Sequence, residues 1–179
     1  NNHRRSVTAV PMEKKSVIKP ALDSSAASTW QDQLGASERQ QQDHYDEIAA
    51  DYEAHYSDEW SVEYRRQFIY EPMFEGIDLS GKEVLDAMCG SGQTTSYLLT
   101  RGAKVTGLDI SNEVLEQFQA RWTEAKALKR SLLDSGLPDN SFDCVAVVGG
   151  LHHIHPEMKA AVREIHRVLK PGGYLCFME

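Results

Sequence analysis

Apolar residues follow two different spacings along the chain, one before residue 80 and one after it. Between residues 43 and 80 they recur every three or four positions, which predicts amphipathic helices. The first helix would carry on one face Tyr45, Ile48, Ala49, Tyr52 and Tyr56. A second helical stretch is predicted near Val62–Phe74. Residues 1–42 are polar and lack this periodicity, so we expect them to form a mobile N-terminal segment.

After residue 80, short apolar runs alternate with helical patterns. The runs predict five strands, at Val84–Ala87, Val105–Leu108, within Ala125–Leu132, Phe142–Val148 and Tyr174–Met178. Helices are predicted between them at Thr94–Thr100, after a Ser111 cap, and from Pro156 onward. Strands that alternate with helices build a parallel sheet with right-handed crossovers. We therefore predict an α/β fold, a Rossmann-like, doubly wound and mostly parallel sheet with helices on both faces.

The first of these strands runs through Asp86 into a glycine-rich turn and then into a helix. Gly90 and Gly92 would let the backbone pass close to a ligand, because they carry no Cβ. The following helix offers unpaired N–H groups and a positive dipole end at the same place. Open α/β sheets bind ligands at such turns, at the carboxyl ends of their strands. The turn is therefore the predicted ligand site.

The residues around the turn favour a cationic ligand over a dinucleotide. A dinucleotide-binding turn has a third glycine where this chain has Thr95. Asp86 would repel a pyrophosphate at close range and attract an ammonium or sulfonium group. Asp109, which ends the second strand about 20 residues after the turn, is suited to accept hydrogen bonds from both hydroxyls of a ribose. An NAD-dependent oxidoreductase stays as an alternative, because Asp109 alone indicates only a nucleoside.

Four blocks of the chain, in this order and spacing, resemble the class I S-adenosylmethionine-dependent methyltransferases. The resemblance is to their small-molecule group, which includes the ubiquinone- and menaquinone-pathway enzymes, and it extends from Tyr45 to Glu179. The blocks are Val84–Gly92, Val105–Ser111, Leu137–Val145 and Val168–Leu175. The resemblance implies transfer of a methyl group from S-adenosylmethionine to a small-molecule acceptor by in-line displacement, with S-adenosylhomocysteine as product.

The resemblance also implies a set of cofactor-binding residues. The methionine moiety would lie against Asp86 and the turn that follows it, Ala87, Met88, Cys89, Gly90 and Gly92. Asp109 would bind the ribose, Ile110 would pack near the adenine, and Leu133 and Asp134 would frame the adenine ring. Four further residues complete the predicted site: Ser111, Gly149, and the tyrosines Tyr45 and Tyr52 of a segment that either packs on the core or closes over the cofactor as a lid.

Histidines follow the fourth predicted strand at His152, His153 and His155. A metal site is not expected there, because adjacent residues of an extended segment point to opposite sides. In related small-molecule methyltransferases a residue at this position lines the reaction centre, so His153, and otherwise His152, is the predicted catalytic residue. A neutral imidazole could remove a proton from the acceptor near physiological pH. A histidine that only shapes the pocket is the alternative.

The family resemblance divides the chain into three parts. Residues 1–42 would be the mobile segment, residues 43–80 a helical lid or N-terminal extension, and residues 81–179 the cofactor-binding core. The fold of the family continues past the fifth strand, so we expect a core that is truncated there. That expectation leaves open a non-catalytic or fragmentary module that acts as a scaffold.

Composition limits the classes of partner that we expect this protein to bind. A net charge of −8 argues against nucleic acid, because phosphates require a basic surface. No apolar run reaches the roughly 20 residues that a membrane span needs. Three cysteines without metal-type spacing suggest a reducing compartment, so a cytoplasmic location is expected. The residues do not indicate the acceptor or the oligomeric state.

Overall fold

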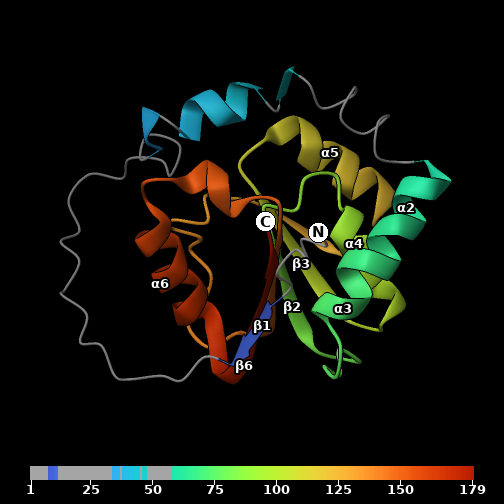
Figure 1. The fold of residues 1–179 in the computed structure, drawn as a ribbon. Helices are drawn as coiled ribbons and strands as arrows, with labels where there is room; N and C mark the ends of the chain where they lie inside the picture. The colour runs from blue at the N-terminus through green and yellow to red at the C-terminus, as the bar shows by residue number, and fades with distance from the viewer. Residues whose placement is uncertain (1–7, 12–33, 37, 45, 48–57) are drawn as a thin grey trace, which may run out of the picture.

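A six-stranded sheet forms the centre of the computed structural model, which describes residues 8–11, 34–36, 38–44, 46–47 and 58–179 (Figure 1). The strand order is β1-β6-β5-β2-β3-β4. The strands are β1 (Thr8–Pro11), β2 (Glu83–Ala87), β3 (Lys104–Asp109), β4 (Lys126–Lys129), β5 (Phe142–Val148) and β6 (Leu169–Met178). Strands β2 to β6 pair in parallel, and β1 pairs with β6 in the antiparallel direction. The predicted α/β fold with five parallel strands is confirmed.

Helices cover both faces of the sheet, because side chains that alternate along each strand are apolar on both sides. Val84 packs in one hydrophobic cluster with Leu98 of α4 (Gln93–Thr100) and Phe118 of α5 (Asn112–Arg121). Its neighbour Leu85 packs in the other cluster with Ile165 of α6 (Met158–Val168). In Figure 1, α6 accordingly lies on the opposite side of the sheet from α4 and α5.

A continuous helical stretch precedes the sheet, as the spacing after Val62 predicts. It consists of α2 (Glu59–Arg65), the π-helical turn η2 (Arg66–Tyr70) and α3 (Glu71–Met73). Asp58 caps its start by accepting a 3.0 Å hydrogen bond from the backbone N–H of Ser61. Tyr70 and Met73 are buried against α4, whereas every side chain of α2 is at least partly exposed. Only the second half of this stretch therefore belongs to the core.

The predicted helix ends in the core agree with the structure, except before α6. Ser111 caps α5 through Val114, and the helix α4 ends before Gly102, whose φ of +76° lies in the left-handed region. After β5 the chain forms a 3₁₀ turn, η3 (Leu151–Ile154), and α6 begins at Met158 instead of Pro156. The extra turn matters for the site, because it carries His152 and His153.

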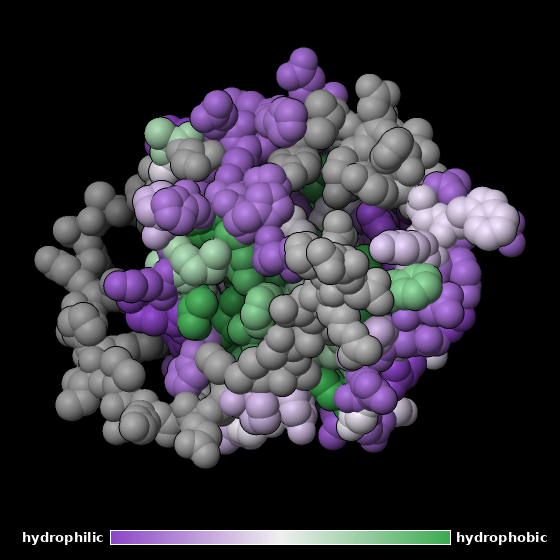
Figure 2. All heavy atoms as spheres, viewed as in Figure 1, coloured by the Kyte–Doolittle hydropathy of each residue, from purple (hydrophilic) through white to green (hydrophobic). Residues whose placement is uncertain are grey.

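The N-terminal segment contains regular structure that the sequence pattern does not predict. Within residues 1–42, expected to be mobile, Thr8–Pro11 form β1 at the edge of the sheet and residues 38–42 are helical. The helical residues 38–44 and 46–47 lie near the carboxyl ends of the strands (Figure 1). The other residues of this segment lie outside the described part of the chain. In the view of Figure 2, hydrophobic side chains gather near the middle of the molecule, and hydrophilic side chains lie toward its periphery.

Residues 130–141, between β4 and β5, consist of turns and extended segments that two side chains of α6 hold in place. The Glu164 carboxylate accepts hydrogen bonds from the backbone N–H and the hydroxyl of Ser135, at 2.9 and 2.5 Å. Arg167 donates to Glu164 and Asp139, at 2.6 Å each, and to the carbonyl of Leu137 at 2.7 Å. These hydrogen bonds fix residues 130–141, and the first residues of this segment line the cavity described below.

Candidate functional site

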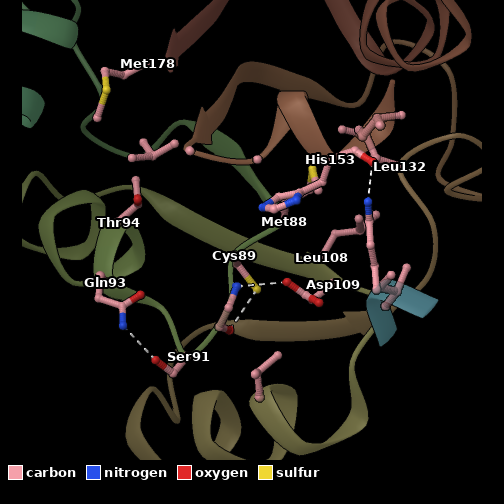
Figure 3. A pocket seen from close by; sticks show the side chains of 18 of the residues that line it. Met88, Cys89, Ser91, Gln93, Thr94, Leu108, Asp109, Leu132, His153 and Met178 are labelled. Atoms are coloured by element: carbon pink, nitrogen blue, oxygen red, sulfur yellow. Dashed lines mark hydrogen bonds between the residues drawn. The ribbon is translucent and has the colours of Figure 1, made fainter. Parts of the chain in front are cut away.

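A cavity of about 960 Å³ opens at the carboxyl ends of the parallel strands. Its floor comes from the turn after β2, the end of β3, and the segments that follow β4 and β5 (Figure 3). Side chains from α2 and from the helical residues near position 40 complete its wall. This is where open α/β sheets place their ligands.

The glycine turn after β2 is held in an unusual conformation by packing. Met88 has φ +59° and Gly92 has φ +92°, both in the left-handed region. A Cβ on Gly92 would stand 2.4 Å from Nε1 of Trp122, which donates a 3.0 Å hydrogen bond to the carbonyl of Ser91. The turn therefore needs a glycine at position 92 because it passes the Trp122 ring there, and not, as expected from the sequence, because a ligand approaches it.

Asp109 joins the glycine turn to the end of β3. Its two carboxylate oxygens accept 3.0 Å hydrogen bonds from the backbone N–H groups of Gly90 and Ser111, and the side chain lines the cavity (Figure 3). Burial raises the pKa of Asp109, whereas those backbone hydrogen bonds lower it. Each oxygen keeps further lone pairs, so the carboxylate can accept hydrogen bonds from a ligand as well.

Asp86 does not line the cavity, which corrects the expectation that it contacts the ligand. Its side chain is 2% exposed and accepts a 2.6 Å hydrogen bond from the hydroxyl of Thr95 in α4. The cause is strand alternation: Asp86 shares with Val84 the face that α4 covers. Burial raises the pKa of Asp86 to about 7. Asp86 is therefore a buried carboxyl group behind the turn.

The segment after β4 contributes its backbone and apolar side chains to the cavity. Ser131, Leu132 and Leu133 line it, and the Ser131 hydroxyl accepts a 3.0 Å hydrogen bond from the backbone N–H of Leu133. Asp134 is exposed and lies outside the cavity wall, so it does not lie where it was predicted to accept from an adenine amine. The tight turn at Ser131 points the next carboxylate toward solvent.

His153 lines the cavity, and His152 does not. The His152 side chain is exposed and lies 2.7 Å from the Glu179 carboxylate, whereas Figure 3 shows His153 beside Met88. The two rings contact each other, with centroids 3.9 Å apart. The expectation that they point to opposite sides is therefore wrong, because the segment is a 3₁₀ turn and not an extended strand. Burial, and secondarily His152, lowers the pKa of His153, which favours its neutral form.

The predicted site residues divide into three groups. Those that line the cavity are Met88, Cys89, Gly90, Asp109, Ile110, Leu133, Gly149 and His153. Those that lie behind or outside its wall are Asp86, Ala87, Gly92, Ser111, Asp134 and His152. Tyr45 and Tyr52 lie outside the described residues. Cys89 is a buried thiol whose pKa is raised by burial, so it packs in the turn and is not an activated nucleophile.

Several cavity residues are absent from the predicted site. The start of α4 supplies Gln93 and Thr94, α2 and η2 supply Trp60, Tyr64 and Tyr70, and the N-terminal helical residues supply Glu38 and Gln41. The predicted border of the pocket along Val62–Phe74 indicates the α2 residues as a region, but not individually. Glu38 and Gln41 carry no periodic signal, because they lie in a polar stretch.

In the part of the chain that the structure describes, no three His, Cys, Asp or Glu side chains are grouped so that they could hold a metal ion. Among the described helices, none is both long and apolar enough to cross a bilayer.

Comparisons with known proteins point to one family. Residues 85–177 match the methyltransferase domain family. An uncharacterised methyltransferase of Synechocystis is 35% identical over 100 residues, which are 55% of this chain and 47% of that protein. The ubiquinone biosynthesis O-methyltransferase of Pseudomonas putida is 32% identical over 109 residues, 58% of this chain and 46% of the enzyme. The chain thus spans a little under half the length of these curated relatives.

The same family is found among solved structures. A S-adenosylmethionine-dependent methyltransferase from Mesorhizobium loti is 29% identical, with a TM-score of 0.52 over 56% of this chain and 47% of that one. The family match covers more than half of the chain and includes the glycine turn, Asp109 and the histidine-bearing turn. The chain therefore belongs to the methyltransferase domain family, and the proteins that it is similar to include a S-adenosylmethionine-dependent methyltransferase and an O-methyltransferase of ubiquinone biosynthesis.

Proposed function

We propose that this protein binds S-adenosylmethionine in the cavity and transfers its methyl group to a small-molecule acceptor. The observation that carries the proposal is the pairing of Asp109 with the glycine turn: one carboxylate faces the cavity while it holds the backbone of Gly90. A carboxylate at the end of the second parallel strand suits the two hydroxyls of a ribose. Family membership supports the same ligand.

The residues that are present fit this cofactor. Asp109 would accept the ribose hydroxyls, and Ile110, Leu132 and Leu133 offer an apolar surface for the adenine. The volume of about 960 Å³ lies near the upper end of ligand pockets, which leaves room for an acceptor beside the cofactor. In Figure 3 Thr94 lies on the far side of the glycine turn from Asp109 and Leu132, and the methionine portion would lie there.

The protein's part in the reaction is alignment and the exclusion of water. When bound, the cofactor supplies a methyl group that is already activated by its sulfonium. The walls of the cavity would hold an acceptor atom in line with that methyl group, and such positioning can account for much of a rate acceleration. His153 lines the cavity with an imidazole whose pKa is lowered, so its neutral form could take a proton from the acceptor.

The wall contributed by the helical stretch before the sheet favours an acceptor with an apolar body. Ile69, Tyr70 and Met178 line the cavity and belong to one hydrophobic cluster. Trp60 and Tyr64 extend this wall outward, and their side chains are 86% and 54% exposed.

Titration calorimetry with S-adenosylhomocysteine and with NADH tests the cofactor assignment. Saturable binding of S-adenosylhomocysteine without binding of NADH is expected, and binding of NADH alone would refute the proposal. Transfer of labelled methyl groups to a panel of apolar hydroxyl- and amine-bearing acceptors then tests activity. If the longest natural form of the protein binds the cofactor tightly but transfers no methyl group to any acceptor, the scaffold alternative is favoured.

A further inference from the structure

The end of β6 holds four consecutive backbone N–H groups of the turn after β5. The carbonyl of Met178 accepts a 2.8 Å hydrogen bond from Gly149. The Glu179 carboxylate accepts from Gly150 at 3.1 Å, from Leu151 at 2.7 Å and from His152 at 3.4 Å. Its second oxygen also lies 2.7 Å from Nδ1 of His152. One carboxylate therefore accepts hydrogen bonds from three backbone N–H groups and also contacts an imidazole.

The turn that Glu179 holds is the one that brings a histidine into the cavity. Gly149, Gly150 and His153 line the cavity, and the backbone N–H of His153 closes the turn onto the carbonyl of Gly150 at 3.1 Å. A Cβ on Gly150 would stand 2.8 Å from the sulfur of Met88. The turn thus touches the glycine-rich turn on one side, and Glu179 fixes it from the other.

We propose that Glu179 is a positioning residue of the site: its carboxylate fixes the 149–153 turn so that the Gly149–Gly150 backbone and the His153 imidazole face the cofactor cavity. Hydrogen bonds from backbone N–H groups to a carboxylate are charge-assisted, so they hold the turn more tightly than a neutral side chain would. The assignment rests on the proposed function, because it gives His153 and the glycine backbone a place beside the cofactor.

The charges around His153 allow a second test of the proposal, which measures the pKa of His153 instead of the affinity for the cofactor. The pKa of His153 is lowered by burial and by the neighbouring His152 and His44, and raised by the negative charge of Glu179. Removal of the Glu179 charge should therefore lower the pKa of His153 further. The titration therefore reports whether Glu179 and His153 lie as close together in solution as in the structure, and the cofactor affinity reports whether that contact positions the site.

The test compares Glu179→Ala and Glu179→Gln with the unchanged protein. Calorimetry with S-adenosylhomocysteine should show at least tenfold weaker binding for Glu179→Ala and a smaller loss for Glu179→Gln, because an amide oxygen still accepts from the turn. NMR titration of the His153 imidazole should show a lower pKa in both variants. Glu124→Gln, which removes an exposed carboxylate, should change neither quantity. His152→Ala should bind within twofold of the unchanged protein, because the backbone hydrogen bonds remain.

The outcomes separate the two proposals. If the unchanged protein does not bind S-adenosylhomocysteine, the proposed function fails. The His153 titration then tests by itself whether Glu179 holds the 149–153 turn. If it binds, and both Glu179 variants keep its affinity and the His153 pKa, then Glu179 is not a positioning residue. Glu179→Gln keeps the test valid if Glu179→Ala does not fold, since its side chain has nearly the same shape.

Discussion

Asp109 and Asp134 show how the direction of a side chain decides the role of a carboxylate. Asp109 is the last residue of β3, and Asp134 lies in the segment that follows β4. Asp109 faces the ligand space and braces the glycine turn, whereas Asp134 follows a tight turn and is exposed. The two residues therefore make a matched pair, one expected to bind the cofactor and one not.

Asp109→Ala is expected to weaken binding of S-adenosylhomocysteine at least tenfold, about 1.4 kcal/mol. The variant removes the acceptor for the ribose and also frees the backbone N–H groups of Gly90 and Ser111. Asp134→Ala should bind as the unchanged protein does. Calorimetry measures both affinities, and equal affinities for the two variants would mean that the ribose does not lie at the end of β3.

At the scale of elements, the glycine turn is kept in shape by α5 as much as by its own sequence. The Trp122 ring at the end of α5 lies against Gly92, and its N–H binds the carbonyl of Ser91. A side chain at position 92 would therefore be destabilising for two reasons: the backbone is left-handed there, and the side chain would overlap the ring.

Gly92→Ala should lower the free energy of unfolding by more than Gly172→Ala does, by about 1–3 kcal/mol. Gly172 is the control because its φ of +77° imposes the same backbone strain while no atom stands within 4 Å of its added Cβ. Urea denaturation measures both changes. If the two variants lose equal stability, the Trp122 ring yields to the new methyl group, and packing does not explain the glycine.

The sequence pattern predicts the elements that the core determines by itself. Strand β5 and helix α5 follow from their apolar spacing, because each buries a recognisable face against the sheet. The pattern does not predict β1, whose place in the sheet comes from backbone pairing with β6. Nor does it predict that His152 and His153 lie in a 3₁₀ turn, because a four-residue turn carries no periodicity.

The candidate site is predictable in its main features and not in its details. The glycine turn and Asp109 carry a spacing that is tied to their chemistry, and both line the cavity. The sequence suggests the wrong surroundings for Asp86, because it does not show that α4 covers the face of β2 on which this side chain lies. Glu38 and Gln41 reach the cavity only through the tertiary position of a polar segment. Contacts of that kind leave no pattern in the local sequence.

For the whole molecule, buried carboxyl groups make stability depend on pH in two directions. Burial raises the pKa values of Asp86 and Asp109 above the ordinary range. Hydrogen bonds and cations outweigh burial and lower those of Asp143 and Glu164. The first pair contributes a stability that is lost as pH rises, and the second pair one that is lost as pH falls. A variant of a single carboxyl group is needed to separate them.

Asp86 has the largest consequence, because its pKa rises from 3.8 to about 7 on folding. Between these values the folded protein binds a proton that the unfolded chain releases, so the contribution of Asp86 to stability falls as pH rises through this range. Asp86→Asn stays neutral and should lose this fall. Relative to the unchanged protein, the variant should gain on the order of 2 kcal/mol in unfolding free energy between pH 5 and pH 8.

Thr95→Val tests the same balance from the other side. The Thr95 hydroxyl donates to the Asp86 carboxylate at 2.6 Å and lowers its pKa, so its removal should raise that pKa further and extend the fall in stability to higher pH. Urea denaturation at several pH values measures both slopes. Parallel pH profiles for Asp86→Asn and the unchanged protein would show that Asp86 is already ionised in the fold at pH 5. In that case its charge would be available behind the glycine turn throughout the physiological range, and its long-range attraction for a sulfonium would have to be counted in cofactor binding.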